Sequence, residues 1–376
     1  MLKLSVAGNS PLRPITCNAP AILRITTNRD YPVPLRTKAC LVLDDVTDDI
    51  PKDFQFVLVR KVSQPELLPE INVLAINTEL AYLNEGDVVK ITPSGRVTTI
   101  YRRKSKANGL LVTERCNSFC VMCSQPPRDI DDDYLIDEYL DAIPLFDRST
   151  REIGITGGEP TILGDRLFML IDALKSYLPE TAVHMLSNGR NFQNLALAQQ
   201  LASRRHPDIM VGIPLYSDIP AIHDFVVQAD GAFDETIRGI LNLKRCGVSV
   251  ELRVVIHRHT YARLPSLAHF NARNLQFVDH VALMGLELMG FAKSNLEDIW
   301  IDPFEYQHEL RLATETLARA RIRTSIYNHQ LCLVPTAIRG FAVKSISDWK
   351  NEYMVECEGC ELKPECGGFF SSASLR

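Results

Sequence analysis

Three cysteines within eight residues constrain this chain more than any other feature of its sequence. Cys116, Cys120 and Cys123 form a C-x3-C-x2-C pattern directly after an apolar run that is typical of a strand. Three thiolates are an incomplete ligand set for a four-iron cluster, so one iron would stay open to an outside ligand, much as a catalytic zinc keeps an open position. No histidine precedes His184 and no cysteine lies between Cys123 and Cys246, so no fourth ligand is near in sequence. We therefore predict an open iron–sulfur site, with zinc or a buried structural trio as the alternatives.

The composition excludes several classes of partner. The 376 residues carry a formal net charge of −5, which gives no general attraction for nucleic acid or acidic membranes. No apolar run reaches the length of about 18 residues that spans a bilayer, and the first ten residues, MLKLSVAGNS, lack the apolar core of a signal peptide. We expect a cytoplasmic protein with no nucleic-acid or membrane partner, whose ten cysteines serve metal or redox chemistry instead of forming disulfides.

The texture of the chain changes twice, which predicts three regions. Residues 1–108 contain short β-branched runs separated by Pro, Asn and Asp, as in a β-rich N-terminal domain, and Thr92–Gly95 would close its last hairpin. Residues 109–321 alternate short apolar strands with segments of helical period, which is typical of βα units on a parallel sheet. Residues 322–376 form a cysteine-rich C-terminal region.

The middle region predicts an α/β fold. Its candidate strands are LLVTE, EIGIT, AVHMLS, IMVGIPL, VELRVVI and VALMGLEL. Asp302, Pro303 and Glu305 fit the cap, first and third positions of a later helix. Six strands interleaved with helices indicate a partial (β/α)6 barrel whose chemistry lies at the carboxyl ends of the strands, with an open doubly wound sheet as the alternative.

The cysteine pattern resembles the signature of radical S-adenosylmethionine (SAM) enzymes, and further motifs of that family follow in order. Gly157, Gly158, Glu159 and Pro160 end the second strand and resemble the GGEP segment that contacts the amino group of SAM. Glycines permit close backbone approach to a ligand, and a glutamate can accept hydrogen bonds from an ammonium group. Taken alone, such a glycine pair is more often a plain turn between a strand and a helix.

Three weaker matches to the family lie further along the strands. Ser187 and Asn188 end the third strand, where the family often contacts the ribose, although SNG is also an ordinary turn. Arg253 on the fifth strand is similar to a basic residue near the carboxylate of SAM, with a buried ion-pair partner as the alternative. Met122 stands where the family often has an aromatic residue near the adenine, so packing there is expected to differ.

The resemblance implies a mechanism. SAM would chelate the open iron, and an electron from the reduced cluster, supplied by a donor such as flavodoxin or ferredoxin, would split its sulfonium. The resulting 5′-deoxyadenosyl radical would take hydrogen from the substrate, while the protein orients the reactants and closes the site.

Four more cysteines lie near the end of the chain. Cys357, Cys360 and Cys366 are closely spaced, and Cys332 precedes them, so together they could complete a metal site. The pattern resembles the auxiliary-cluster tails of radical peptide-modifying enzymes and implies a second, auxiliary 4Fe-4S cluster. A structural zinc is the alternative, and His329 could replace Cys332 as a ligand.

Several stretches, including GDVVKITPSGRV, NGLLVTERCNSFCVMCSQPPR, GITGGEPT, HMLSNGRNF and the CGGFFSS end, resemble the His-Xaa-Ser system radical SAM maturase family, in particular its C-type maturase. The resemblance implies a ribosomally made peptide or protein substrate with His-Xaa-Ser repeats and a partner radical maturase. Two alternatives stay open. One is a small-molecule radical enzyme similar to the 7-carboxy-7-deazaguanine synthases, and the other is a non-enzymatic, metal-stabilised binding module.

Overall fold

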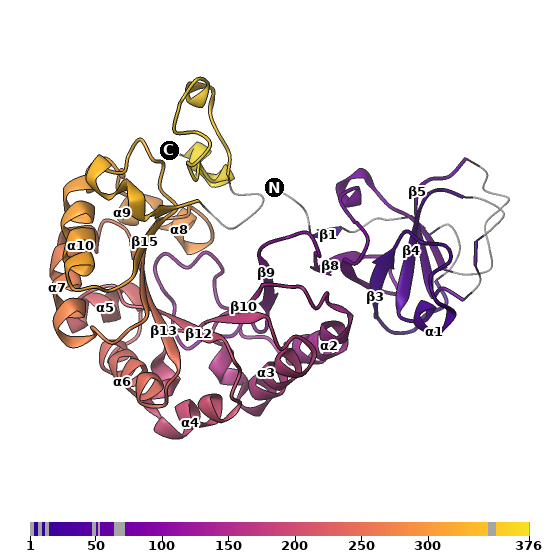
Figure 1. The fold of residues 1–376 in the computed structure, drawn as a ribbon, viewed down its shortest axis with the longest axis horizontal. Coiled ribbons are helices and arrows are strands. Elements are labelled where there is room, and N and C mark those ends of the chain that lie inside the picture. Colours follow the sequence, from indigo (N-terminus) through magenta and orange to yellow (C-terminus); the bar gives the residue numbers. More distant parts are fainter. Residues whose placement is uncertain are drawn as a thin grey trace. The chain divides into compact units, whose positions relative to one another are not determined.

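The computed structural model describes residues 4–6, 10–11, 15–46, 50–51, 53–63, 72–344 and 351–375. Two compact units divide the chain (Figure 1). The first comprises residues 1–110, 136–151 and 173–181, and the second comprises residues 111–135, 152–172 and 182–376. The boundaries expected from sequence texture, at residues 108 and 321, stay a prediction.

The first unit contains a mixed sheet with strand order β1-β8-β7-β3-β4-β5-β6-β2. Its strands are β1 (Ser5–Val6), β2 (Ser10–Pro11), β3 (Ala21–Thr26), β4 (Ala39–Asp45), β5 (Phe56–Lys61), β6 (Asn72–Ala75), β7 (Val88–Ile91) and β8 (Val97–Tyr101), and α1 (Val33–Arg36) precedes β4. Successive strand residues face opposite sides of a sheet. Cys40 and Val42 accordingly belong to one apolar cluster and Leu41 and Leu43 to another, so β4 is buried on both faces. The expected hairpin is β7–β8, whose turn Gly95 closes with a hydrogen bond to Thr92 O.

The second sheet runs in sequence order from β9 to β16, and the strand pairs from β10 to β16 are parallel. Its strands are β9 (Asn108–Leu111), β10 (Glu152–Thr156), β11 (Ala182–Leu186), β12 (Ile209–Pro214), β13 (Ser249–Ile256), β14 (His280–Gly285), β15 (Thr324–Tyr327) and β16 (Ala342–Val343). The predicted α/β fold with a parallel sheet is confirmed, because each buried strand is followed by a crossover that returns the chain to the same edge.

Helices α4, α6, α7 and α10 line the outer side of this curved sheet (Figure 1). The helices of the chain after β9 are α2 (Tyr134–Ala142), α3 (Asp165–Tyr177), α4 (Leu195–Ser203), α5 (Pro220–Val227), α6 (Ala232–Arg245), α7 (Leu264–Asn274), α8 (Phe291–Ser294), α9 (Leu296–Ile299) and α10 (Gln307–Arg319). This arrangement leaves the inner face of the strands, and the loops after their carboxyl ends, for polar side chains and ligands.

One sequence expectation about this region was incomplete and one was wrong. The six candidate strands are followed by two more, β15 and β16, which extend the sheet. The late helix does not begin at Asp302. Asp302 accepts a hydrogen bond from Phe304 N, but the bond from Glu305 N to Asp302 O closes a turn, and α10 starts only at Gln307.

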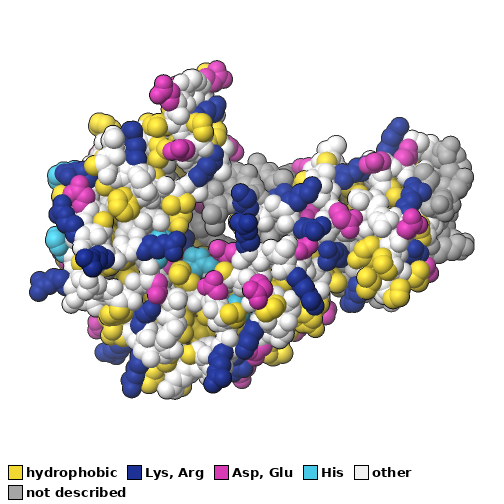
Figure 2. Space-filling view, viewed as in Figure 1, with side chains coloured by type: hydrophobic (Ala, Val, Ile, Leu, Met, Phe, Trp, Pro, Cys, Tyr) yellow, Lys and Arg dark blue, Asp and Glu magenta, His cyan; other side chains and the backbone are white. Residues whose placement is uncertain are grey.

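Among the described residues, no helix is both long enough and apolar enough to cross a membrane. On the face drawn in Figure 2, lysine and arginine side chains lie among aspartate and glutamate side chains instead of forming a single basic patch. Interspersed charge of both signs agrees with the small net charge of −5.

Candidate active site

The loop that carries Cys116, Cys120 and Cys123, called the cysteine loop below, follows β9. It is held directly against the end of β10. Gly158 N donates to Thr113 O and Glu159 N to Arg115 O, both at 2.8 Å. A Cβ atom added at Gly158 would lie 2.1 Å from Arg115 O and 3.0 Å from Cys116 Cβ. No side chain fits there, so glycine is what allows the two loops to approach. The glycine therefore lets the backbone that leads into the cysteines approach closely, and the implied approach to SAM stays a prediction.

The neighbouring residues of the GGEP segment are placed by the same contact. A Cβ atom at Gly157 would lie 2.4 Å from Thr113 O. Pro160 is buried and begins a short 3-10 helix, η4 (Pro160–Leu163), where its missing N–H has no partner to lose. The segment thus turns sharply away from the cysteine loop after Glu159.

Asp132 anchors the start of the cysteine loop, and sequence reasoning missed it. Its carboxylate is almost fully buried and accepts hydrogen bonds from Thr113 Oγ1 at 3.0 Å and Arg115 Nε at 3.1 Å, and also from Glu114 N. Charge-assisted bonds of this kind are stronger than neutral ones. The backbone immediately before the first cysteine is therefore fixed by a residue that lies beyond the last one.

Glu159 joins the ends of β10 and β11. Its carboxylate is fully buried and accepts from Thr161 N at 3.1 Å, Thr161 Oγ1 at 2.5 Å, Ser187 Oγ at 2.8 Å and Asn188 N at 2.6 Å. Burial raises the pKa of Glu159, and the four donors oppose that rise. The implied contact between Glu159 and the amino group of SAM stays a prediction, because its oxygens here bind the protein itself.

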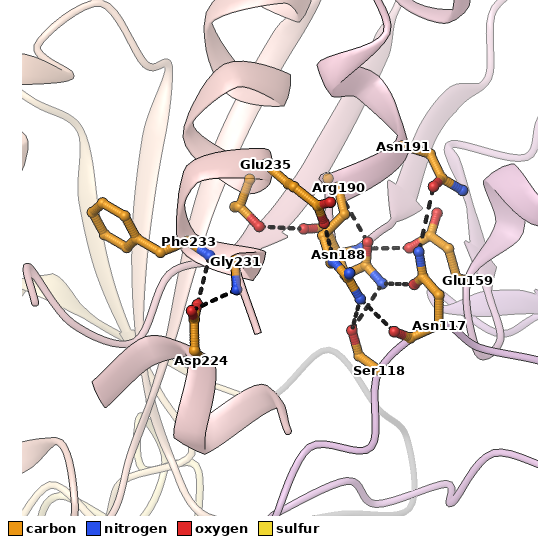
Figure 3. Close-up of polar contacts among 12 residues, drawn as sticks. Asn117, Ser118, Glu159, Asn188, Arg190, Asn191, Asp224, Gly231, Phe233 and Glu235 are labelled. Carbon is orange, nitrogen blue, oxygen red and sulfur yellow. Dashed lines mark hydrogen bonds and ion pairs between the residues drawn. The ribbon is translucent and has the colours of Figure 1, made fainter. Parts of the chain in front are cut away.

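Asn188 links the third strand end to the cysteine loop (Figure 3). Its Nδ2 donates to Asn117 Oδ1 at 2.5 Å and lies 3.4 Å from Ser118 Oγ and 4.0 Å from Cys116 Sγ. Ser187 Oγ in turn accepts from Gly189 N at 3.1 Å, which shapes the turn. The two residues that the resemblance assigned to the ribose are thus beside the cysteine loop, and their contact with a ribose stays a prediction.

Arg190 also holds the cysteine loop, and sequence reasoning missed it too. Its Nε donates to Glu235 Oε2 at 2.6 Å, while its Nη1 donates to Asn117 O and, at 3.2 Å, to Ser118 Oγ (Figure 3). The positive charge of Arg190 also acts to lower the pKa of the nearby Cys120 thiol. The only sequence signal was an arginine directly after the SNG turn, and its partner is 45 positions away.

Helices α5 and α6 support the cysteine loop from outside the barrel. Phe119 N donates to Val227 O at 3.0 Å and Val121 N to Val226 O at 2.9 Å, so the loop pairs with the last residues of α5. These bonds use carbonyl groups at the C-terminal end of a helix, which have no partner within the helix. The loop therefore satisfies the last carbonyl groups of α5, and the same hydrogen bonds fix the position of the loop.

Asp224 of α5 fixes the start of α6 (Figure 3). Its carboxylate accepts from Gly231 N at 2.8 Å and Phe233 N at 2.7 Å, which satisfies amide groups that the first turn of a helix leaves open. Glu235, the partner of Arg190, lies in that same first turn. The corner between α5 and α6 thereby holds both contacts to the cysteine loop in register.

The three cysteines are close enough to influence one another. Burial raises the pKa of Cys116 to about 11, that of Cys120 to about 12 and that of Cys123 above its usual range, and Cys116 and Cys123 each raise the pKa of Cys120 further. Buried neighbouring thiols become thiolates only when positive charge compensates them. Iron supplies that charge, so the donor set fits a cluster.

No group of three or more His, Cys, Asp or Glu side chains in the described part of the chain is arranged to hold a metal ion. A four-iron cluster is larger than one ion, and its thiolate ligands stand correspondingly further apart than those of zinc. The assignment of the cluster to Cys116, Cys120 and Cys123 stays a prediction.

Met122 packs into the apolar cluster beneath the cysteine loop. Only 6% of the residue is exposed, and the buried members of the cluster include Tyr216, Val226, Ala292 and Ile299. The side chain thus supports the loop from below, and its implied position near an adenine stays a prediction.

Arg253 forms an ion pair, which the sequence offered as the alternative to a contact with SAM. Its Nη1 donates to Glu251 Oε1 at 2.6 Å, and 24% of its side chain remains exposed. An ion pair with one nitrogen leaves room for a second partner, so the implied contact with SAM stays a prediction.

The four C-terminal cysteines surround one cavity. Cys332, Cys357, Cys360 and Cys366 line a space of about 350 Å³ together with apolar and aromatic side chains, including Tyr353. The other three cysteines all act to raise the pKa of Cys332, although burial is the larger cause. Cys332 therefore lies beside the three closely spaced cysteines, and the metal site that these four could complete stays a prediction.

His329 is placed away from that cavity lining and already has two partners. Its Nε2 lies 2.9 Å from Tyr306 Oη and its Nδ1 lies 2.8 Å from Tyr327 O. Burial lowers the pKa of His329 to about 4. These contacts explain His329 as a buried structural residue, which leaves Cys332 as the better candidate ligand.

The cysteine-rich tail is tied to the segment after β15. Gln330 Nε2 donates to Gly368 O at 3.1 Å, and Leu331 N lies 3.4 Å from Cys366 Sγ. Within the tail, Tyr353 Oη donates to Cys366 O at 2.7 Å. These bonds thus hold the tail, with Cys357, Cys360 and Cys366, beside the segment that contains Cys332.

Comparison with known proteins identifies part of the chain. Residues 110–270 match the model of the Radical SAM superfamily, whereas no curated protein matches. Among solved structures, the fold is similar to SuiB of Streptococcus suis bound to S-adenosylmethionine, with 15% identity over 60% of this chain and 51% of SuiB and a TM-score of 0.49. The chain thus spans about half the length of SuiB.

Two further structures have similar values. Native anSMEcpe with bound AdoMet has 14% identity over 58% of this chain and 63% of its own, with a TM-score of 0.47. A radical SAM methyltransferase from Sphaerobacter thermophilus has 15% identity over 64% of this chain and 72% of its own, with a TM-score of 0.44. On the family match and the parallel α/β fold, this chain contains a radical SAM domain over residues 110–270.

Proposed function

We propose that this chain is an enzyme that holds a 4Fe-4S cluster on Cys116, Cys120 and Cys123 and uses it to cleave SAM reductively. The observation that carries the proposal is the loop of three cysteines, held by the ends of β10 and β11 inside a domain that matches the Radical SAM superfamily. When bound, the reduced cluster and SAM supply a 5′-deoxyadenosyl radical.

The residues of the chain position these groups. Arg190 and Asn188 hold the backbone and side chain of Asn117, which fixes the spacing between the first two cysteines. Glu159 ties the strand ends together. A rigid, buried scaffold of this kind keeps reacting groups in one geometry and restricts access of water.

We further propose that Cys332, Cys357, Cys360 and Cys366 hold an auxiliary 4Fe-4S cluster. The cavity of about 350 Å³ that they line is large for a single ion and is bordered by sulfur, which suits iron–sulfur clusters. Zinc is the alternative outcome.

The substrate we propose is a ribosomally made peptide or protein with His-Xaa-Ser repeats, acted on together with a partner radical maturase and a flavodoxin or ferredoxin as electron donor. The sequence stretches that resemble the maturase family support this substrate. We also propose a cytoplasmic location, because cysteines grouped as metal ligands suit a reducing compartment.

The experiment that tests the reaction compares three proteins reconstituted with iron and sulfide under anaerobic conditions. Wild-type protein and the control Cys246→Ala should both convert SAM to 5′-deoxyadenosine when reduced. The triple variant C116A/C120A/C123A should form none. Reductive cleavage of SAM by the triple variant would overturn the assignment of the cluster to these cysteines. If wild-type protein that holds iron did not cleave SAM, the proposed function would be overturned.

A second experiment tests the substrate. A peptide with His-Xaa-Ser repeats is incubated with the active enzyme, the partner maturase and SAM, and its mass is measured. A mass change that requires Cys120 supports the peptide substrate. An unchanged peptide beside normal SAM cleavage would contradict the substrate but leave the radical chemistry standing.

A further inference from the structure

A buried carboxylate on β13 lies beside three basic side chains: Arg253 on the same strand, His184 on β11 and His280 on β14. Glu251 Oε1 accepts from Arg253 Nη1 at 2.6 Å, and Glu251 Oε2 lies 2.6 Å from His280 Nδ1. His184 Nε2 lies 3.4 Å from Oε1, and His280 Nε2 lies 2.9 Å from Ser325 Oγ. Because a carboxylate only accepts, His280 must donate from Nδ1. The cluster therefore joins β11, β13, β14 and β15.

This cluster lies on the inner face of the sheet. Glu251 and Arg253 alternate along β13 with Val250, Leu252 and Val254, which are almost fully buried. Successive residues of a strand point to opposite faces, and the helices cover the outer one. The charged residues are thus on the face that encloses the interior of the barrel.

Gly212 makes the cluster geometrically accessible. It lies on β12 between the strands of His184 and Glu251, and it pairs with Glu251 in register. A Cβ atom added there would lie 3.0 Å from Arg253 Cδ and 3.0 Å from His184 Nε2. The glycine lets two long side chains meet across a strand, so the sequence of β12 is matched to the cluster.

Arg253 on β13 lies beside the carboxyl end of the neighbouring strand, β12, and close to the cysteine loop. It pairs with Pro214, the last residue of β12, and its carbonyl oxygen accepts from Leu215 N at 3.1 Å. The next residue, Tyr216, packs in the same apolar cluster as Met122 and Cys120. Arg253 therefore reaches the level of the barrel where a cofactor bound to the cysteine loop would lie.

Glu251 holds only one edge of the Arg253 guanidinium. Among the described residues, Glu251 is the hydrogen-bond partner of that guanidinium, through Nη1, and 24% of the side chain is exposed. A guanidinium carries five N–H donors in a fixed plane, which suits bidentate binding of a second carboxylate. Burial would raise the pKa of Glu251, but the nearby His184, the hydrogen bond with His280 and the charge of Arg253 hold it below its usual range.

We propose that Glu251 is a positioning residue: braced by His184 and His280, it holds the Arg253 guanidinium so that its free edge binds the carboxylate of SAM. The inference rests on the proposed function, since it requires that SAM binds at the cysteine loop. It goes beyond that function because it predicts that a residue without any contact to SAM controls the affinity for SAM.

The test measures the dissociation constant of SAM by equilibrium dialysis with the reconstituted holoenzyme, before any turnover. Glu251→Gln keeps the shape of the side chain but removes its charge, so we expect the dissociation constant to rise about tenfold, the effect of losing roughly one charge-assisted hydrogen bond. Arg253→Gln should weaken binding at least as much. The control Glu152→Gln neutralises another strand glutamate, on β10, and should bind SAM like wild type.

The double variant E251Q/R253Q separates positioning from general damage. If Glu251 acts through Arg253, the double variant binds SAM no more weakly than R253Q alone. Independent, multiplied losses would overturn the proposal, as would an E251Q protein that binds SAM like wild type. Should E251Q lose its iron or melt early, Glu251→Asp, which keeps the charge with a shorter reach, replaces it in the same cycle.

The outcomes distinguish the two levels of the argument. Wild-type protein that holds its cluster but does not bind SAM would overturn the proposed function and this inference together. Normal SAM binding and cleavage by wild type, with an unchanged E251Q, would overturn only the role of Glu251.

Discussion

At the scale of single residues, the site depends on a position where only glycine fits, because a side chain would collide with the backbone. Gly158 lies where its hydrogen faces Arg115 O and Cys116 Cβ, at distances that no side chain tolerates. Gly109 is only seven positions before Cys116, and nothing lies within 4 Å of a Cβ added there. The two glycines form a matched pair for substitution, because Gly109, on β9, is close to the cysteines in sequence and only Gly158 is crowded.

We predict that Gly158→Ala lowers the stability of the protein by about 2 kcal/mol or more, because overpacking forces the two backbones apart. Gly109→Ala should change stability by less than about 1 kcal/mol. Thermal unfolding of both apoproteins measures the difference. Equal melting temperatures for the two variants would show that the close contact at Gly158 is not needed.

Arg190 provides a second prediction at this scale. Arg190→Gln removes its ion pair with Glu235 and weakens its hold on Asn117 O, bonds whose charged members are worth roughly 1.5–3 kcal/mol each. We expect iron to leave the reduced, reconstituted protein at least tenfold faster, measured with a coloured chelator. Exposed Arg238 lies on the same helix as Glu235, so Arg238→Gln is the control. Iron release at the wild-type rate from R190Q would refute this role of Arg190.

At the scale of elements, the cysteine-rich tail is the part whose order depends most on what it binds. Over residues 351–375, its regular structure is limited to the 3-10 helices at Val355–Cys357 and Ser371–Leu375 and one bridge between Glu352 and Phe369. A segment with so little regular structure gains its stability from side chains and ligands. The four cysteines around one cavity are the natural place for that ligand.

We therefore predict that C357A/C360A reduces the iron content of reconstituted protein from about eight to about four atoms per chain, since each 4Fe-4S cluster contributes four. Trypsin should also cut the tail of this variant faster. Cys246→Ala, a cysteine outside both groups, should retain full iron and wild-type resistance. Zinc in wild-type protein made with ample iron would contradict the auxiliary cluster.

At the scale of the whole molecule, three buried histidines make the fold sensitive to acid. Burial lowers the pKa of His223 to about 4, that of His257 to about 3 and that of His329 to about 4. In the unfolded chain, a histidine titrates near pH 6.5. The unfolded state therefore binds more protons as pH falls below about 6.5, and stability is lost until the folded-state pKa values are reached.

We predict that the melting temperature of the apoprotein falls steadily between about pH 6.5 and 4, each histidine contributing on the order of 3 kcal/mol to the loss. His329→Gln keeps a polar side chain beside Tyr306 and should reduce the dependence on pH. The exposed His308 is the control, and His308→Gln should leave the dependence unchanged. A melting temperature that is constant over this range would contradict the prediction.

The sequence predicted what is encoded locally. The alternation of short apolar runs with helical periods was enough for the parallel sheet, because each strand is buried on the helix-facing side. β15 escaped notice because Thr324–Tyr327 is short and begins with two polar residues, of which Ser325 faces inward and contacts His280. Local pattern could not indicate that a polar run pairs with β14.

Long-range partners explain the remaining omissions. Asp132 meets Thr113 across 19 positions, and Arg190 meets Glu235 across 45. Each of these residues is individually unremarkable in the sequence, since charged side chains are usually solvated. Only the folded chain brings them to the cysteine loop, so the scaffold around the predicted ligands could be found only from the structure.

The most direct test of the central claim, an open cluster on the cysteine loop that binds SAM, is electron paramagnetic resonance of the C357A/C360A protein, in which the cysteine loop holds the one remaining cluster. A reduced 4Fe-4S cluster with an open iron changes its spectrum when a ligand binds that iron. We predict a different spectrum after SAM is added. An identical spectrum with and without SAM, in protein that contains the cluster, would contradict the claim.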